Sequence, residues 1–248
     1  MTVSRREPVR SVGIVATVAF ALLYLGVVAV LAYVAVSLRP HLAPIASMAP
    51  NLLPGDWFLV ARNAYGFSRH SLPFGLVRFE GRVAARAPEA GDIVVCLSRE
   101  HDDTTYVFRV VGLPGDEVAM IGGRLHLNGE PVEALAAERP ESVDEMPAGT
   151  RYYREVLPNG ASYLIADTDA DSFGDNAEAV IVPTGHVFVL GDNRDNANDS
   201  RFGLGPVPLE RLIGRALAVY WNEEGSPVAG RRWLLPDTLY PAAKKAGG

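Results

Sequence analysis

The sequence predicts a mainly β protein, in which an antiparallel β-sheet domain follows a single N-terminal membrane-spanning helix. Two observations predict this architecture. One uncharged apolar run near the N-terminus is long enough to cross a bilayer. The rest of the chain consists of short apolar or alternating runs separated by Gly, Pro, Asn and Asp. Beyond the first segment helical periodicity is scarce, and only VPLERLIG (207–214) suggests one or two helical turns.

The apolar run SVGIVATVAFALLYLGVVAVLAYVAVSL covers residues 11–38 and contains no charged residue. About 20 helical residues cross the hydrocarbon core, so this segment spans it with length to spare. A cleaved signal peptide has an apolar stretch of only about 7–15 residues, so we expect a permanent anchor. Arg5, Arg6 and Arg10 precede the run. By the positive-inside rule they place residues 1–10 in the cytoplasm and the main domain on the outer, extracytoplasmic side of the cell membrane.

After the anchor, the pattern is that of short strands joined by turns. The Asn-Gly pair in LNGE (127–130) predicts a hairpin. Residues 132–178 are more polar, with weaker strand signals. The expected strands are DWFLVARNAY (56–65), GDIVVCLS (91–98), TYVFRVVGL (105–113), EVAMIGG (117–123), RLHLNGEPV (124–132), ASYLIAD (161–167), HVFVLGD (186–192) and RALAVYWN (215–222). The expected organisation is a cytoplasmic tail (1–10), an anchor (11–38), an exported β-rich domain (39–243, with its core at about 41–118 and 185–222 and an elaboration at about 119–184) and a flexible tail (244–248).

Composition excludes several classes of function. The formal net charge is -6 and the basic residues are scattered, which argues against nucleic acid as a partner. The only lysines are Lys244 and Lys245, so nearly all positive charge is arginine. The single cysteine, Cys96, excludes an internal disulfide and cannot build a metal site alone. It lies in the apolar run DIVVCL, which predicts a buried strand position.

Three stretches carry residues suited to chemistry. SMAPNLLPGD (47–56) places Ser47 before two proline-guided turns, a setting that suits an exposed hydroxyl on a rigid loop. FRVVGLPGDEV (108–118) is a strand that ends in a Pro-Gly turn. GDNRDNANDSRFGLGPVP (191–208) is a polar loop between an apolar strand and a proline-rich exit. One such loop is usually only a turn, but three behind an N-terminal anchor form a pattern.

This pattern resembles the type I signal peptidases, the S26-like membrane-bound serine endopeptidases that cut signal peptides from exported preproteins. GGRLHLNGEPVE (122–133) and GHVFVLGDNRDN (185–196) add to the match, which covers essentially the whole chain. The resemblance implies a signal-peptidase-like β domain. Its partners would be the lipid bilayer and signal peptides of preproteins, with small residues of the Ala-x-Ala type before the cut. It implies no cofactor and no metal.

The resemblance also assigns roles to positions. Ser47 takes the place of the nucleophile, and its backbone N–H would help form the oxyanion hole. The family's lysine general base belongs at Phe108, and the serine that hydrogen-bonds this lysine belongs at Ala197. Many Gram-negative members carry an auxiliary oxyanion serine at the position of Ile45. Asn51 stands where threonine is usual.

The supporting residues of the pattern are intact. Asp199, Ser200 and Arg201 continue the family's box, and the family's Arg-Asp pairing would join Arg109 to Asp199. The lysine, its serine partner and the oxyanion serine surround one reaction centre, and all three are apolar here. Losing the lysine alone would leave a buried hydroxyl short of a partner, at about 1–3 kcal/mol, whereas losing both partners relieves that cost.

We therefore expect a signal-peptidase scaffold with weak or lost catalysis. Two alternatives stay open: a fully active peptidase with an unidentified base, or a non-catalytic homologue that binds preproteins or regulates an active peptidase. For each histidine a solvated or structural role is the simpler reading, and an exposed tail lysine stays protonated near neutral pH. The histidines are His41, His70, His101, His126 and His186.

Two further features have a simple and a functional interpretation. Leu52, Leu53, Trp57 and Phe58 follow the serine, and they are either strand core or a surface that touches the lipid interface. The loop 167–178 places carboxylates at the positions of a calcium loop, but Ser172 stands where glycine is required, so an acidic surface loop is the simpler reading. The carboxylates are Asp167, Asp169, Asp171, Asp175 and Glu178.

Overall fold

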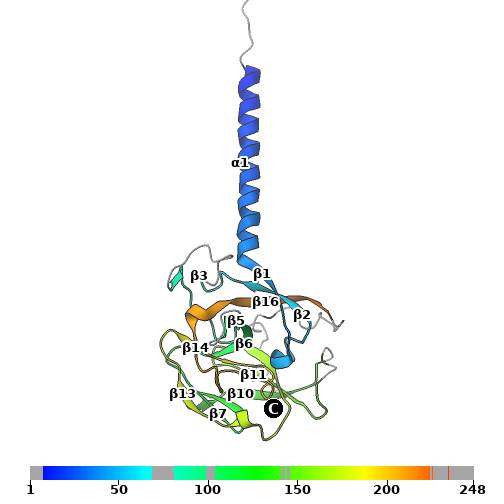
Figure 1. The fold of residues 1–248 in the computed structure, drawn as a ribbon, viewed down its shortest axis with the longest axis vertical. Helices are drawn as coiled ribbons and strands as arrows, with labels where there is room; N and C mark the ends of the chain where they lie inside the picture. Colours follow the sequence, from blue (N-terminus) through cyan, green and yellow to red (C-terminus); the bar gives the residue numbers. More distant parts are fainter. Residues whose placement is uncertain are drawn as a thin grey trace, which may run out of the picture. The chain divides into compact units, whose positions relative to one another are not determined.

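A computed structural model of the protein describes residues 8–68, 81–98, 104–140, 143, 146–223, 225 and 234. The chain divides into two compact units, Met1–Leu38 and Arg39–Gly248. The first is helical, and the second is built almost entirely of β-strands (Figure 1). The mainly β architecture predicted from the sequence is confirmed.

The first unit is one helix, α1 (Pro8–Ser37). Its stretch Val15–Ser37 is 23 residues long and at 1.5 Å per residue extends about 35 Å, and the mean hydropathy within it reaches 2.5. Large apolar side chains such as Leu22 and Tyr24 are exposed along it. A helix satisfies all its backbone hydrogen bonds internally, as lipid demands, so this segment fits a membrane span.

The second unit is organised around a seven-stranded sheet, in which the strands follow the spatial order β1-β2-β16-β5-β6-β14-β15 (Figure 1). The pairings from β2 through β15 are antiparallel, as the sequence predicts. The strands are β1 (Leu38–Leu42), β2 (Asp56–Ala61), β5 (Ile93–Leu97), β6 (Thr105–Gly112), β14 (His186–Leu190), β15 (Val207–Pro208) and β16 (Leu212–Asn222). A short 3₁₀ helix, η4 (Leu209–Arg211), replaces the turn or two of helix expected in VPLERLIG.

Smaller sheets lie between β6 and β14 in the sequence. A four-stranded sheet has the order β13-β7-β8-β9 and a three-stranded sheet the order β10-β11-β12, while β3 and β4 form a separate pair. The strands β10, β11 and β13 were not among those expected. The bounds are β3 (Phe67–Ser68), β4 (Arg82–Val83), β7 (Glu117–Ile121), β8 (Arg124–Leu127), β9 (Glu130–Pro131), β10 (Glu133–Ala137), β11 (Arg151–Val156), β12 (Ser162–Asp167) and β13 (Ala177–Ile181).

The Asn-Gly hairpin forms where the sequence predicts it. Asn128 and Gly129 connect β8 to β9 with φ of 54° and 83°, the left-handed conformation that these two residues adopt most easily. The Asn128 side chain accepts a hydrogen bond from the Glu117 backbone N–H at 2.9 Å and donates one to Asp116 at 3.0 Å. The turn is therefore tied to the neighbouring strand.

Alternate residues of β6 and β14 face two different hydrophobic cores. On β6, Phe108 and Val110 belong to one core, which also contains Met48 of the serine loop, whereas Val111 belongs to the other. On β14, Val187 and Val189 likewise face the first core, and their neighbours face the second. Successive strand residues point to opposite faces, so Phe108 and its neighbour Arg109 lie on opposite sides of the sheet.

Arg109 is an ion-paired arginine on the second side of the sheet. Its side chain is 3% exposed and makes two hydrogen bonds to Asp192, from Nε to Oδ1 at 2.7 Å and from Nη2 to Oδ2 at 2.6 Å. It also donates to the Gly91 carbonyl at 2.7 Å, and its guanidinium lies 4.0 Å from the Tyr163 ring centroid. Burial disfavours its charge, but Asp192 outweighs that cost and the pKa of Arg109 is raised. Bidentate pairing of this kind suits arginine rather than lysine.

The expected pairing of Arg109 with Asp199 is therefore wrong. Asp199 pairs with Arg201 at 2.9 Å, while the partner of Arg109 is Asp192. The register of the two strands explains this, because Leu190 of β14 lies opposite Arg109. Asp192 follows two residues later, at the end of that strand, and there it meets the Arg109 guanidinium. Asp199 is seven residues further along the same loop.

Replacing Asp192 by Asn should destabilise the protein by about 3–5 kcal/mol, because Arg109 would stay buried without its counter-charge. Urea unfolding of the full chain in detergent, followed by tryptophan fluorescence, measures the loss. The matched control is Asp167→Asn, which breaks the more exposed 2.6 Å pair with Arg151 and should cost at most about 1 kcal/mol. Equal losses in the two variants would contradict a structural role specific to the buried pair.

The thiol of Cys96 should be inert in the folded protein. It is completely buried in β5, as the sequence predicts, and burial raises its pKa from 9.0 to about 12. Because the thiolate is the reactive form, iodoacetamide at pH 8 should label Cys96 only after unfolding, which mass spectrometry detects. The folded state retains the proton between pH 9 and about 12 while the unfolded state loses it, so this group's stabilising contribution falls as pH rises through that range. Rapid labelling of the folded chain would contradict this.

Candidate active site

Ser47 is the middle residue of a short 3₁₀ helix, η1 (Ala46–Met48). Its backbone is held in place by Asn193, whose N–H donates to the Ser47 carbonyl at 3.0 Å and whose side-chain amide donates to the Ala46 carbonyl at 3.1 Å. The turn after it closes through hydrogen bonds from Asn51 and Leu52 back to the Met48 carbonyl. The loop around Ser47 is thus rigid, as the two prolines predict.

The Asn51 side chain connects this loop to the buried ion pair. Its amide donates to Asp192 Oδ2 at 2.7 Å and to the Leu164 carbonyl at 2.7 Å. Asp192 therefore receives hydrogen bonds both from the serine loop and from Arg109 of β6. This arrangement fixes the position of η1 relative to the strand on which the family's base belongs.

The hydroxyl of Ser47 lies in largely apolar surroundings. The residue is only 6% exposed, between Ala46 and the buried Met48, so the expectation of an exposed hydroxyl is wrong. No side chain within the described ranges forms a hydrogen bond with its Oγ. A serine nucleophile is ordinarily activated by an adjacent general base that takes its proton.

Phe108 lies on β6, the strand that contacts η1. It is 3% exposed and packs in the same hydrophobic core as Met48 and Ala197. Its ring stacks on that of Tyr106, with 5.9 Å between centroids and 28° between ring planes. A phenyl ring well packed in this way fills the space near the serine loop and offers no atom that can accept a proton.

Ala197 lies where the end of β14 approaches the serine loop. A Cβ placed on Gly191 would come within 2.2 Å of the Ala197 methyl group and 2.7 Å of the Ser47 carbonyl oxygen. Only glycine fits at position 191, and Ala197 and the Ser47 backbone pack on either side of it. The methyl group is 7% exposed and belongs to the core that contains Phe108. The structure thus brings Ser47, Phe108 and Ala197 into one neighbourhood.

Ile45 is different from these three residues, because its side chain is 59% exposed. It precedes η1 in an extended conformation, with φ of −139° and ψ of 162°. Its apolar side chain cannot supply a hydrogen bond to an oxyanion. The three apolar residues Phe108, Ala197 and Ile45 therefore comprise two core residues and one surface residue.

The polar residues at the end of the loop shape its backbone. Asp199 accepts a hydrogen bond from the Gly191 N–H at 2.9 Å and pairs with Arg201 through both carboxylate oxygens. Ser200 Oγ accepts from the Val189 N–H at 3.0 Å. These polar residues thus hold the loop 191–201 against β14. In the described part of the chain, none of them forms a hydrogen bond to the Ser47 hydroxyl.

The histidines in the described part of the chain have structural surroundings. Burial lowers the pKa of His41, and its ring contacts Phe58 with 5.9 Å between centroids. His126 and His186 each place Nδ1 3.1 Å from the carbonyl oxygen of the residue two positions earlier. The remaining candidates, His70, His101, Lys244 and Lys245, lie outside the described residues.

Several functionally placed residues were missed by sequence reasoning. Asp192, Asn51 and Asn193 connect the serine loop to the sheet, and Arg194 forms a buried pair with Glu155 through bonds of 2.8 and 2.5 Å. Asp192 could have been found, because it is the first carboxylate after the strand that neighbours Arg109. The others depend on contacts between distant segments, which a single sequence does not reveal.

The structure gives contacts for both of the features that have two interpretations. Leu52, Leu53 and Phe58 are buried, whereas the half-buried Trp57 donates from Nε1 to Glu223 at 2.8 Å. In the acidic loop, Asp167 pairs with Arg151, Asp175 forms a capping box with Ser172 around η3 (Phe173–Asp175), and Asp169 accepts from the Asp171 N–H. The described residues contain no cluster of three ligands able to hold a metal ion.

The chain is similar to known signal peptidases. A family model described as "Signal peptidase, peptidase S26" matches residues 14–221. Signal peptidase I of Rickettsia bellii (strain OSU 85-389) is 36% identical over 195 residues, which cover 75% of this chain and 66% of that protein. Signal peptidase I of Rickettsia akari (strain Hartford) is 35% identical over 196 residues, covering 75% and 72%. The crystal structure of a signal peptidase I from Enterococcus faecalis V583 matches 52% of this chain and 97% of its own, at 22% identity and a TM-score of 0.31. On the family model and the curated relatives, the chain belongs to the signal peptidase family, peptidase S26.

Proposed function

We propose that this protein is a membrane-anchored signal-peptidase scaffold that engages the signal peptides of exported preproteins but cleaves them weakly or not at all. Ser47 occupies the nucleophile's place, and the expected side chain for removing its proton is replaced by Phe108. The observation that carries the proposal is the burial of Phe108 in the core beside the serine loop, with 3% of its surface exposed. The family's small-residue preference, Ala-x-Ala before the cut, is the expected specificity.

The chemistry requires a neutral amine next to the serine. Desolvation lowers a lysine pKa by as much as about 3–5 units, which is how an apolar pocket makes a lysine into a base near neutral pH. Phe108 retains the apolar pocket and removes the amine. Losing a general base costs about 10²–10⁴-fold in rate, and more where base and nucleophile act as a unit.

Two stretches of unpaired backbone support an extended peptide as the ligand. The β6–β14 ladder ends at the Arg109–Leu190 pair, so within the described ranges no strand pairs with that edge of β6 from Thr105 to Phe108. Ile45 is extended and exposed, and its backbone N–H forms no hydrogen bond to another described residue. Because η1 contacts β6, a peptide can add as a strand beside these segments without any chemistry at Ser47.

The topology is part of the proposal. The arginines at positions 5, 6 and 10 favour a cytoplasmic N-terminus, with the β domain on the extracytoplasmic side, where preproteins emerge. The apolar stretch Val15–Ser37 fits the anchor, and the proposed exported domain covers residues 39–243. In the sequence Ser47 lies ten residues after the end of α1.

Restoring the two missing polar groups should restore cleavage. The double variant Phe108→Lys/Ala197→Ser places an amine in an apolar site with a hydroxyl beside it, so we expect at least about a hundredfold gain in cleavage of an Ala-x-Ala preprotein. A gel assay with the full chain in detergent measures it. Adding Ser47→Ala to the double variant should abolish the gain, and Ala197→Ser alone should give none.

The same gel assay tests the proposal on the unaltered protein. Cleavage by the wild type at the rate of a lysine-bearing signal peptidase, lost on Ser47→Ala, would overturn the proposal of weak catalysis and favour an unidentified base. Failure of the double variant to gain activity would show that the site has changed beyond these two positions.

Peptide binding should be detectable without cleavage. A photo-crosslinking amino acid at position 45 or 106 should capture a signal peptide in the wild-type background, because both positions border the unpaired backbone. The matched control is position 173, where Phe173 is 89% exposed on a different loop and should give no specific adduct. Adducts at all three positions alike, or at none, would contradict a peptide site beside Ser47.

A further inference from the structure

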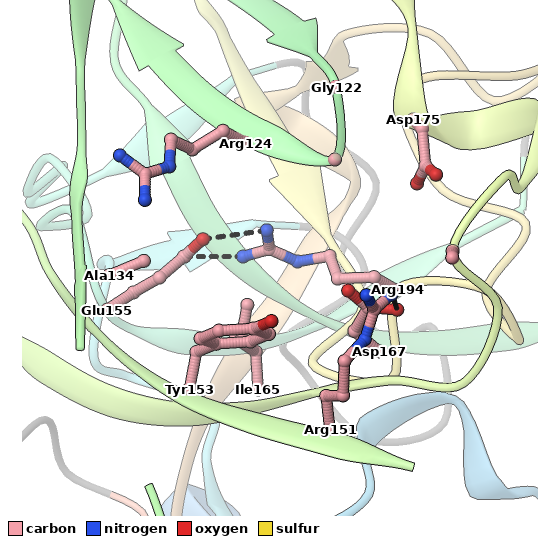
Figure 2. A pocket seen from close by; sticks show the side chains of 12 residues that line it. Gly122, Arg124, Ala134, Arg151, Tyr153, Glu155, Ile165, Asp167, Asp175 and Arg194 are labelled. Atoms are coloured by element: carbon pink, nitrogen blue, oxygen red, sulfur yellow. Dashed lines mark hydrogen bonds and ion pairs between the residues drawn. The ribbon is translucent and has the colours of Figure 1, made fainter. Parts of the chain in front are cut away.

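A pocket with charged walls lies away from Ser47, among the smaller sheets. It has a volume of about 200 Å³ and opens between the β7–β8 hairpin, the sheet β10-β11-β12 and η3. Figure 2 shows Arg124 and Asp175 on opposite sides of it, with the Glu155–Arg194 pair between them. Nothing in the proposed peptidase chemistry uses these side chains.

The charged groups on the floor of the pocket are already paired with each other. Glu155 and Arg194 are almost wholly buried and form two hydrogen bonds with each other, at 2.8 and 2.5 Å. Glu155 also accepts a hydrogen bond from the Tyr163 hydroxyl at 2.9 Å. Each charge on the floor therefore already has its partner, and a ligand gains little from competing with them.

Asp175 presents a carboxylate that lacks a cation. It is 9% exposed, and Oδ2 accepts a hydrogen bond from the Ser172 N–H at 3.0 Å. It forms no ion pair with any residue in the described ranges. Burial raises the pKa of Asp175 and the charges of Asp195 and Asp167 raise it further, while the Ser172 hydrogen bond and the charge of Arg201 lower it by less. An ammonium group placed here would relieve both effects.

Arg124 presents the complementary charge. It begins β8, and its guanidinium is exposed at the opposite wall, where it forms no hydrogen bond or ion pair with a described side chain. The other arginine at the rim, Arg151, is already paired with Asp167. Guanidinium groups favour carboxylates, which they bind with two parallel hydrogen bonds.

Two glycines keep the space between these walls open. Gly122 and Gly123 have φ of 56° and 74°, and a Cβ on Gly123 would stand 3.4 Å from Asp175 Oδ1. Tyr153 and the buried Ile165 form an apolar side of the pocket. The volume of the cavity equals that of about seven water molecules at ~30 Å³ each, which is close to the volume of a very small peptide.

We propose that this pocket binds a short peptide with free termini, of about two small residues, with its ammonium at Asp175 and its carboxylate at Arg124. An extended dipeptide spans at most about 7 Å between its ends, and its side chains would lie against Tyr153 and Ile165. The two unmatched charges select for a ligand that carries both signs at once. The site does not include Ser47, so the test of this proposal does not depend on the proposed peptidase function.

The test is calorimetric titration of the full chain in detergent with alanyl-alanine. We expect saturable binding, weakened at least about tenfold for N-acetyl-alanyl-alanine and for alanyl-alanine amide, because each lacks one charge. Asp175→Asn should weaken binding of alanyl-alanine similarly, and so should Arg124→Gln. Ala134→Phe, which fills the cavity from β10 without altering charge, should abolish binding.

The matched controls are Glu178→Gln and Arg86→Gln, which remove exposed charges outside the pocket and should leave the affinity unchanged. The blocked peptides need no change in the protein, so the test holds even if one variant fails to fold. Absence of saturable binding would overturn the proposal. So would equal affinity for the free and blocked peptides, or binding that persists in Ala134→Phe.

Discussion

One carboxylate, that of Asp192, joins three parts of the molecule that must stay in register for the serine loop to sit against the sheet. It receives two hydrogen bonds from Arg109 of β6 and one from Asn51, which follows η1, and its own chain continues from β14. All of these groups are buried or half-buried, so each bond is made in a medium where an unpaired charge is costly. The position of Ser47 depends on this junction.

In the proposed assignment of positions, Phe108 and Ala197 stand where the family carries polar groups, and both pack into a single core. Replacing only one of such a pair would leave a buried donor or acceptor without a partner at that position, whereas replacing both leaves none at these two positions. The supporting ion pairs rely on arginine, in the pairs Arg109–Asp192, Arg194–Glu155 and Arg201–Asp199, so the absence of lysine from residues 1–243 does not weaken them.

Sequence reasoning succeeded where patterns are local. Strands with alternating or continuous apolar runs, such as β5 and β14, and the turn at Asn128 follow from short-range rules. It failed on β10 and β13, whose residues are mostly exposed and whose sequences, EALAA and AEAVI, lack the strict alternation of a half-buried strand. It also chose Asp199 over Asp192 for Arg109, because the register of two strands is a long-range property. The pocket walled by Arg124 and Asp175 was invisible for the same reason, since its residues come from several separate segments.

The alternation along β6 has a consequence for how such a protein can change. Phe108 and Arg109 are neighbours in sequence, yet one faces the serine loop and the other faces the buried carboxylate across the sheet. One face of the strand packs towards the serine loop, and the other carries the buried Arg109–Asp192 pair. Substitutions on the first face leave the ion pair on the second in place, so catalysis can be lost or regained in evolution while the fold is kept.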